Sequence, residues 1–388
     1  MATDGAPQTV IKPSSAAVQS ADGQSTIERG TCYATYVYDV GYSIDLNLVE
    51  RRGAQGTERE TIKHKRKAPR YFEYQPAPLR INEPVDPIAL GQFRTGAVAD
   101  CVLYDFGAIS VTYEIDIAGP LDRLASLSDQ LYESKALQHD SRRRVDVFTQ
   151  TYAEFISKSN ISPLVEDYVI FQIAKMKSPI RPASLLETQS QQLAQILRSE
   201  QQTLSDQEVR DALSHHISFS TDDVTIIDWQ AALVIDDEAE DVRTVLEFAN
   251  VELLEMRYLD DQLDRVLDQS YRTLSQQSWR HFFSFRHSTR ELRRLARLQM
   301  ESAVLFEEVN NALKLLGDQY LARVYRLASQ RLHIGEWDAS ILRKLHTVES
   351  IYSKMSDHQS TRRMELLEWI IIALIAISTI LALLPGLH

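Results

Sequence analysis

The chain has little cysteine and an excess of acidic residues. Only Cys32 and Cys101 occur among 388 residues, so neither a disulfide framework nor a four-cysteine zinc site can form within it. Both cysteines lie in apolar, strand-like runs, which predicts buried free thiols and a reducing compartment. The net charge of −12 argues against nucleic acid as a partner of the chain as a whole.

Motifs of the common enzyme classes are also missing. The chain contains no HExxH, GxSxG, CxxC or GxGxxG pattern. Gly91 and Gly96 have the spacing of a phosphate-binding loop, but Ala97 stands where that loop needs a lysine. We therefore expect no nucleotide and no other cofactor.

Proline and glycine are nearly absent from one long stretch. Residues 238–363 contain no proline and two glycines, which favours long uninterrupted helices. Apolar residues recur there in steps of three and four, in seams that begin at Leu246, Phe306 and Ile341. This spacing predicts a stalk of helices packed as a coiled coil, or as an antiparallel bundle because Asp260 interrupts the first seam. Such a stalk suits a homo-oligomer or a protein partner.

The preceding part of the chain has mixed patterns. Residues 1–30 are small and polar, which predicts a disordered tail. Residues 31–237 predict an α+β domain, with a ferredoxin-like sandwich as its candidate form. The strands are expected at 32–38, 43–49, 98–106, 108–115, 164–174 and 224–235, where β-branched and aromatic residues gather. The helices are expected at 121–138, 144–158, 189–197 and 206–213.

The chain ends in a long apolar run at residues 366–387. Its central sixteen residues, 369–384, contain no charge, proline or glycine. As a helix the whole run would rise ~33 Å, and the hydrocarbon core of a bilayer is ~30 Å thick. This predicts one transmembrane anchor with membrane lipid as its partner, entered through Trp369, Ile370, Ile371, Ile372 and Leu374.

Two arginines predict the orientation of this anchor. Arg362 and Arg363 precede the run, and positive charge collects on the cytoplasmic side of membrane spans. We therefore expect the bulk of the chain in the cytoplasm at a bacterial inner membrane. The alternative is a mitochondrial inner membrane with the bulk facing the matrix.

Two charged clusters are candidate sites. Asp236, Asp237 and Glu240 lie in the densest acidic run and could hold Mg²⁺ or Ca²⁺; the alternative is a cap on the helix expected to follow. A basic cluster behind three phenylalanines could bind RNA or a ribosome, another partner, or anionic lipid. It could equally be a solvated helix face. Its members are Arg286, Arg290, Arg293, Arg294 and Arg297.

Three stretches together resemble a known family. They are the hairpin CVLYDFGAISV at 101–111, the helix LEFANVELLEMRY at 246–258 and LEWIII at 367–372. In this order they resemble the RMND1/RMD1 family, also called DUF155, over about residues 30–388. The resemblance implies an N-terminal α/β domain, a helical coiled-coil region and C-terminal membrane helices. It also implies a link to translation, since eukaryotic members support mitochondrial translation at the inner membrane.

The resemblance brings no catalytic residues with it. The acids in residues 1–30 do not fit a mitochondrial transit peptide, which favours a bacterial member. The sequence thus favours a non-enzymatic, membrane-anchored interaction or scaffold protein, linked to translation or to a complex at the membrane by the resemblance. The alternative is a membrane-bound enzyme with an acidic, metal-dependent site at Asp236, Asp237 and Glu240.

Overall fold

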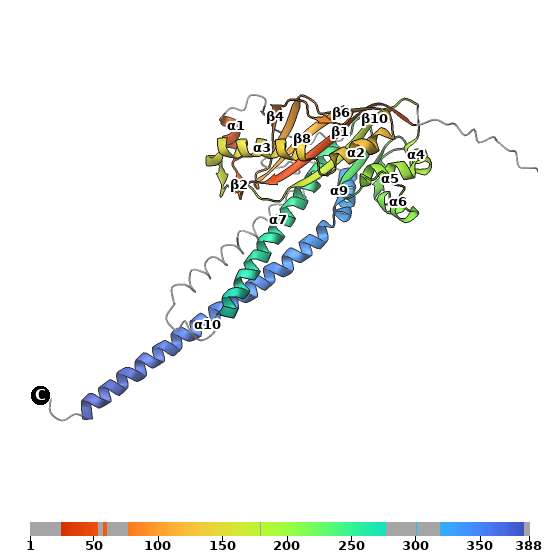
Figure 1. Ribbon diagram of the computed structural model, residues 1–388. Coiled ribbons are helices and arrows are strands. Elements are labelled where there is room, and N and C mark those ends of the chain that lie inside the picture. Colours follow the sequence, from red (N-terminus) through yellow and green to blue (C-terminus); the bar gives the residue numbers. More distant parts are fainter. Residues whose placement is uncertain are drawn as a thin grey trace, which may run out of the picture.

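The computed structural model describes residues 25–52, 57–59, 77–178, 180–276, 300 and 319–383. A large β-sheet with helices on its faces forms a head, and two long helices leave this head side by side as an arm (Figure 1). The protein is therefore a mixed α/β structure in which one helical arm extends from the sheet.

The main sheet has nine strands in the order β11-β12-β13-β10-β1-β8-β7-β4-β3. Neighbouring strands are antiparallel except for the parallel pair β10–β13. Two small ribbons, β2–β9 and β5–β6, lie outside it. The strands are β1 Thr26–Asp39, β2 Ser43–Ile44, β3 Thr57–Arg59, β4 Leu79–Pro84, β5 Ala89–Leu90, β6 Phe93–Arg94, β7 Val98–Leu103, β8 Ala108–Pro120, β9 Ile156–Ser157, β10 Glu166–Met176, β11 His216–Ile217, β12 Val224–Ile227 and β13 Ala231–Ile235.

Helices cover both faces of the sheet. One face carries α2 to α5, and the opposite face carries α7, α9 and the start of α10 (Figure 1). The helices are α1 Leu46–Arg51, α2 Arg123–Leu131, α3 Lys135–Thr151, α4 Pro182–Thr188, α5 Ser190–Arg198, α6 Asp206–Ala212, α7 Glu240–Gln276, α9 Gln319–Arg331 and α10 Ile334–Leu383.

Strand β1 shows why both faces must be covered. Successive side chains of a strand point to opposite faces, and β1 is apolar on both. Tyr36 and Tyr38 belong to the core under α2 to α5, whereas Val37 belongs to the core under α7. A strand with two apolar faces is stable only between two layers, as in sheets with helices on each side.

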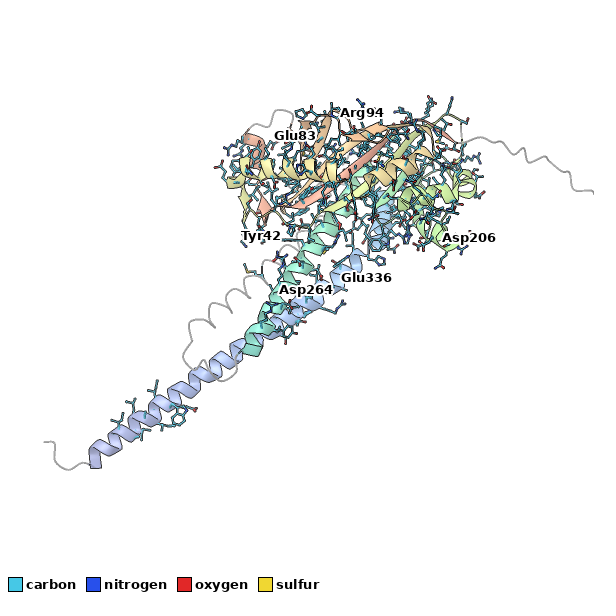
Figure 2. The ribbon with its side chains drawn as sticks, in the orientation of Figure 1. Tyr42, Glu83, Arg94, Asp206, Asp264 and Glu336 are labelled. Carbon is cyan, nitrogen blue, oxygen red and sulfur yellow. The ribbon has the colours of Figure 1, made fainter. Side chains whose placement is uncertain are left out.

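The arm consists of α7 and α10, which lie in parallel. Ser340 donates to Asp260 at 3.2 Å, and Lys344 pairs with Asp260 at 2.8 Å and with Asp264, one helical turn further on, at 2.6 Å. The contacts advance along both helices in the same direction, and Asp264 is labelled part-way along the arm in Figure 2. The buried Leu263 and Ile341 lie in the same apolar cluster. Asp260, which interrupts the first seam, is therefore accommodated by a lysine and a hydroxyl of α10.

Several expected elements are confirmed and others are wrong. The strand at 32–38, the hairpin around Gly107 and the strands at 164–174 and 224–235 are present as β1, β7–β8, β10 and β12–β13. The strand expected at 43–49 is confirmed only at β2, Ser43–Ile44. It is wrong beyond that, because Asp45 accepts hydrogen bonds from the backbone of Asn47 and Leu48 and caps α1. The tail expected for 1–30 is wrong at its end, where residues 26–30 begin β1.

Helix boundaries between 121 and 158 also differ from the expectation. The helices expected at 121–138 and 144–158 are instead α2 and α3, with a break at Glu133 and Ser134. Glu133 has a φ of 50°, which stops a helix. The nine-stranded sheet covered on both faces also replaces the four-stranded ferredoxin-like sandwich.

The expected transmembrane anchor is wrong. Within the described residues, no helix has the length and apolar character needed to cross a membrane. The expected location at a bacterial or mitochondrial inner membrane depended on this anchor and is therefore not supported either.

The hairpin between β7 and β8 makes a testable close approach. Gly107 has a φ of 101°, and a Cβ there would lie 1.9 Å from the backbone oxygen of Gly41. We expect Gly107→Ala to destabilise the protein by about 2–4 kcal/mol in urea unfolding, because neither backbone can move away cheaply. Gly335→Ala is the matched control: nothing lies within 4 Å of that Cβ, and we expect a gain of about 0.5–1 kcal/mol. Equal effects at the two sites would contradict this reading.

Candidate functional site: a basic groove beside α3

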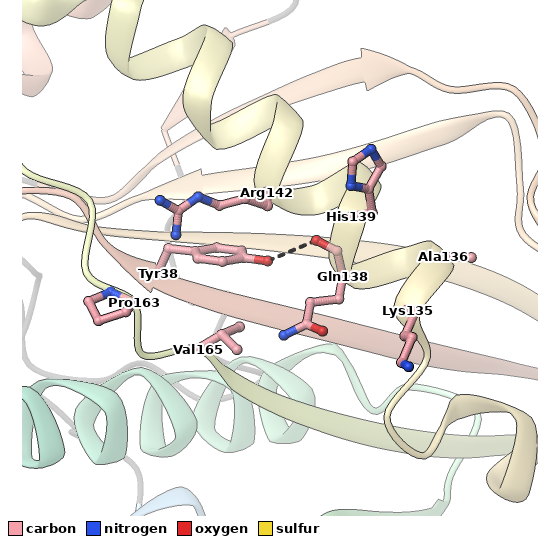
Figure 3. A pocket seen from close by; sticks show the side chains of 8 residues that line it. All are labelled: Tyr38, Lys135, Ala136, Gln138, His139, Arg142, Pro163 and Val165. Atoms are coloured by element: carbon pink, nitrogen blue, oxygen red, sulfur yellow. Dashed lines mark hydrogen bonds between the residues drawn. The ribbon is translucent and has the colours of Figure 1, made fainter.

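A groove lies between the first half of α3 and the segment that leads into β10. Its volume is about 640 Å³, and Figure 3 shows its lining side chains. The lining residues come from β1, α3 and that segment: Tyr38, Lys135, Ala136, Gln138, His139, Arg142, Pro163 and Val165.

Three of the lining side chains are basic and share one side of α3. Lys135, His139 and Arg142 are spaced by four and three residues, which places them on the same helix face. No carboxylate is among the lining residues. The groove therefore offers a positively charged edge beside an apolar wall of Pro163 and Val165.

Tyr38 forms the floor of the groove. It is 2% exposed, and its hydroxyl lies 2.7 Å from Ser141 Oγ and donates to the carbonyl of Gln138 at 3.3 Å (Figure 3). Burial raises the pKa of this phenol, although the hydrogen bond from Ser141 works against the shift. Tyr38 is thus a neutral, fixed surface. The Arg142 guanidinium lies 5.9 Å from the centre of its ring.

The wall opposite α3 is tied to the end of β1. Ser162 N donates to Asp39 O at 2.9 Å, and Asn160 N donates to Val40 O at 3.0 Å. Arg142 crosses the groove end and donates to Ser162 O at 3.0 Å, while its Nε donates to Asp146 at 3.2 Å. The shape of the groove is therefore set by backbone and side-chain bonds before any ligand arrives.

Helix α3 is held on the sheet by a buried ionic network. Asp140 accepts from Tyr113 Oη at 2.8 Å, from Arg143 at 2.6 Å and from Arg144 at 2.7 Å, and Arg144 also donates to Glu83 at 2.9 Å. Burial alone would raise the pKa of Asp140, but the hydrogen bonds from Arg144, Tyr113 and Arg143 outweigh it, so the pKa lies below its usual value. The network fixes the helix that carries the basic side chains.

The acidic run lies at the start of α7, away from the groove. Asp236 Oδ1 accepts from Glu238 N at 3.0 Å, Asp237 pairs with Arg29 at 2.7 Å, and Glu240 stands in the first turn of α7. These contacts are those of a helix N-terminus, where acids are favoured. Across the described parts of the chain, no three His, Cys, Asp or Glu side chains are grouped so that they could hold a metal ion.

The basic cluster lies outside the residues that the structure describes. Residues 277–299 are not among the described residues, so the structure places none of its members: Arg286, Arg290, Arg293, Arg294 and Arg297. None of the groove residues was singled out from the sequence. Their spacing within one helix was the available signal, and the helix break expected between 138 and 144 concealed it.

Two buried acids lie on the other face of β1 from Tyr38. Asp39 and Glu255 of α7 are each 1% exposed, and both oxygens of Glu255 and Oδ1 of Asp39 lack a hydrogen-bond partner. Burial raises the pKa of both carboxyl groups, and for Glu255 the proximity of Asp39 adds to the rise. The same two causes raise the pKa of neighbouring Tyr258 to about 12. Burial therefore favours the protonated form of both acids at the junction of the sheet and α7.

This pair makes stability depend on pH. As the pH rises above the usual carboxyl range, the unfolded chain ionises while the folded chain keeps its protons, so the free energy of unfolding falls. Glu255→Gln removes one such acid. We expect its stability relative to the unmodified protein to increase from about pH 5 to about pH 8, by up to ~1.4 kcal/mol per pH unit, in urea titrations.

The exposed Glu187→Gln on α4 is the control for this experiment. Its side chain is open to solvent, and we expect a difference that does not vary with pH. A Glu255→Gln effect that is constant or falls with pH would contradict a buried, protonated pair.

Comparison with known proteins places the head in a family. Residues 29–241 match the family model described as "Uncharacterized protein MJ0711, N-terminal domain". The uncharacterized protein MJ0711 of Methanocaldococcus jannaschii is 26% identical over 232 residues, which cover 59% of this chain and 69% of that protein. No solved structure matches the chain. Since the match covers more than half of the sequence, the chain belongs to the family of the MJ0711 N-terminal domain.

Proposed function

We propose that this protein is a non-enzymatic interaction protein whose head binds an acidic segment of a partner protein in the basic groove. The observation that carries this proposal is the set of three basic side chains on one face of α3, of which Arg142 pairs with Asp146, in a groove that no carboxylate lines. An aspartate- or glutamate-rich segment would meet Lys135, His139 and Arg142 with its charges. Its apolar residues would lie on Pro163, Val165 and the ring of Tyr38.

The groove suits recognition better than catalysis. Its floor is a buried phenol with a raised pKa, and its lining contains no cysteine and no carboxylate that could orient His139 for proton transfer. General acid–base chemistry needs a group whose pKa lies near the working pH and a partner that orients it. Charge-assisted hydrogen bonds from fixed cations instead give affinity and orientation to an anionic ligand.

The far end of the arm supports an interaction role. Seven large apolar side chains between Trp369 and Ile377 are 46–70% exposed, and contiguous exposed apolar surface marks sites of association. A second copy of the chain or a protein partner on the arm would cover them. We also propose that the chain is related to the RMND1/RMD1 family. Because eukaryotic members of that family support mitochondrial translation, the partner would then be a component of the translation apparatus.

Binding of a labelled acidic peptide tests the groove. The probe is a fluorescent octapeptide of alternating glutamate and leucine, and the matched ligand has glutamine at each glutamate. We expect binding of the glutamate peptide alone, weakened as salt screens the charges. The double variant Lys135→Gln, His139→Gln is expected to weaken it about three- to tenfold, since an exposed charge contributes up to ~1 kcal/mol and a neutral hydrogen bond about 0.5–1.5 kcal/mol.

Arg210→Gln is the control, because Arg210 is an exposed cation on α6. Equal binding of both peptides, or equal loss in the control, would contradict the groove as the site. A single-stranded RNA that binds in place of the peptide, and loses affinity in the double variant, would turn the proposal toward nucleic acid.

A further inference from the structure

A second hollow lies where the head meets the arm. Its volume is about 390 Å³, and it is lined by Trp229, His333, Glu336, Trp337 and Ser340; we call it the tryptophan notch. Trp229 comes from the turn between β12 and β13, and the other four residues come from the connection of α9 to α10 and the first turns of α10. Glu336 is labelled at this junction in Figure 2.

Trp229 is held in place although it is open to solvent. It is 43% exposed, and its indole stacks on the His333 imidazole at 4.9 Å between ring centres, with 23° between planes. His333 itself has a φ of 52°, and its carbonyl accepts from Glu336 N at 2.9 Å and Trp337 N at 3.2 Å. The strained residue thus connects α9 to α10 and presents its ring to Trp229.

The turn that carries Trp229 is locked by a buried carboxylate. Asp228 is fully buried, pairs with Arg198 Nε at 2.6 Å, and accepts from Arg331 Nε at 2.7 Å and from Trp229 N at 2.9 Å. Tyr168 Oη donates to the carbonyl of Asp228 at 3.0 Å. The wall of the notch is therefore preorganised, so binding a ligand would cost little free energy for ordering these side chains.

The charge of the notch is negative. Of its five lining residues, only Glu336 is an acid and none is a lysine or arginine. The Glu336 side chain is 80% exposed and lies 2.7 Å from His333 Nδ1. The nearby Arg331 is matched by Asp211 as well as by Asp228. Two indoles and a carboxylate, whose Oε1 already lies against His333 Nδ1, line the notch with no lysine or arginine among them, which favours a positively charged ligand.

We propose that the tryptophan notch binds a guanidinium group, in the form of an arginine side chain of a partner polypeptide. The guanidinium is flat and weakly hydrated, so it stacks on indole faces while its N–H groups donate to a carboxylate. The Glu336 carboxylate and Ser340 Oγ are the acceptors that line the notch. This site is separate from the basic groove and does not depend on the function proposed for it.

Fluorine NMR of 5-fluorotryptophan protein tests the notch in the full chain. The chain has four tryptophans, whose signals are assigned by single tryptophan-to-phenylalanine variants. Titration with the capped tripeptide Gly-Arg-Gly is expected to shift the Trp229 and Trp337 signals and to leave that of Trp369, near the far end of α10, unchanged. The same tripeptide with citrulline, a neutral isostere of arginine, is expected to cause no shift.

Variants and competing ligands separate the alternatives. Glu336→Gln is expected to weaken binding of the arginine peptide about three- to tenfold, whereas Glu349→Gln, also on α10, leaves its affinity unchanged.

Free arginine is expected to bind more weakly than the capped peptide, because its carboxylate is repelled by Glu336. Tighter binding of the free amino acid would overturn the choice of a polypeptide. Equal shifts with citrulline, or shifts with adenosine alone, would overturn guanidinium recognition. The Lys135→Gln, His139→Gln variant must retain full arginine binding, which keeps this result independent of the groove.

Discussion

The burial of β1 on both faces is the constraint on which the rest of the structure depends. Tyr36 and Tyr38 require cover on one side of the sheet and Val37 requires it on the other. Helices α2 to α5 supply the first layer, and α7 supplies the second. Because α7, which is 37 residues long, continues beyond the sheet, the helix that completes the head also begins the arm. The packing of α7 against the sheet therefore joins the head and the arm in one structure.

Buried charges hold the segments that lie far apart in the sequence. Asp140 connects α3 to β8, and Asp228 connects the β12–β13 turn to α5 and α9. Each has arginine partners, and loss of a partner from a buried pair is costly. Among the described residues no arginine or lysine pairs with Asp39 or Glu255, and burial raises the pKa of both carboxyl groups instead. The two candidate binding sites lie beside these fixed points, where side chains are already positioned for a ligand.

The sequence predicted much of the fold because local patterns determined it. Alternation around Gly107 predicted the β7–β8 hairpin, and the heptad spacing predicted that residues such as Leu263 and Ile341 pack helix against helix. Asp45 misled the prediction because its capping bonds turned an apparently alternating stretch into α1. The apolar end of α10 misled it further, because the length of the run and its lack of charge were taken as evidence of a span. Neither candidate site was found. The helix break expected between 138 and 144 concealed the basic face of α3, and the tryptophan notch depends on contacts across long sequence separations, such as that between Trp229 and His333.

Hydrogen–deuterium exchange along α7 tests most directly whether head and arm form one cooperative unit. The account predicts that amides of α7 between Val251 and Leu263, which lie in the shared core, exchange as slowly as those of β1. Both should then exchange only through global unfolding. Amides near the end of α7 should exchange faster. Rapid exchange throughout α7 beside a protected β1 would contradict the account, because it would show that the sheet is stable without its second layer.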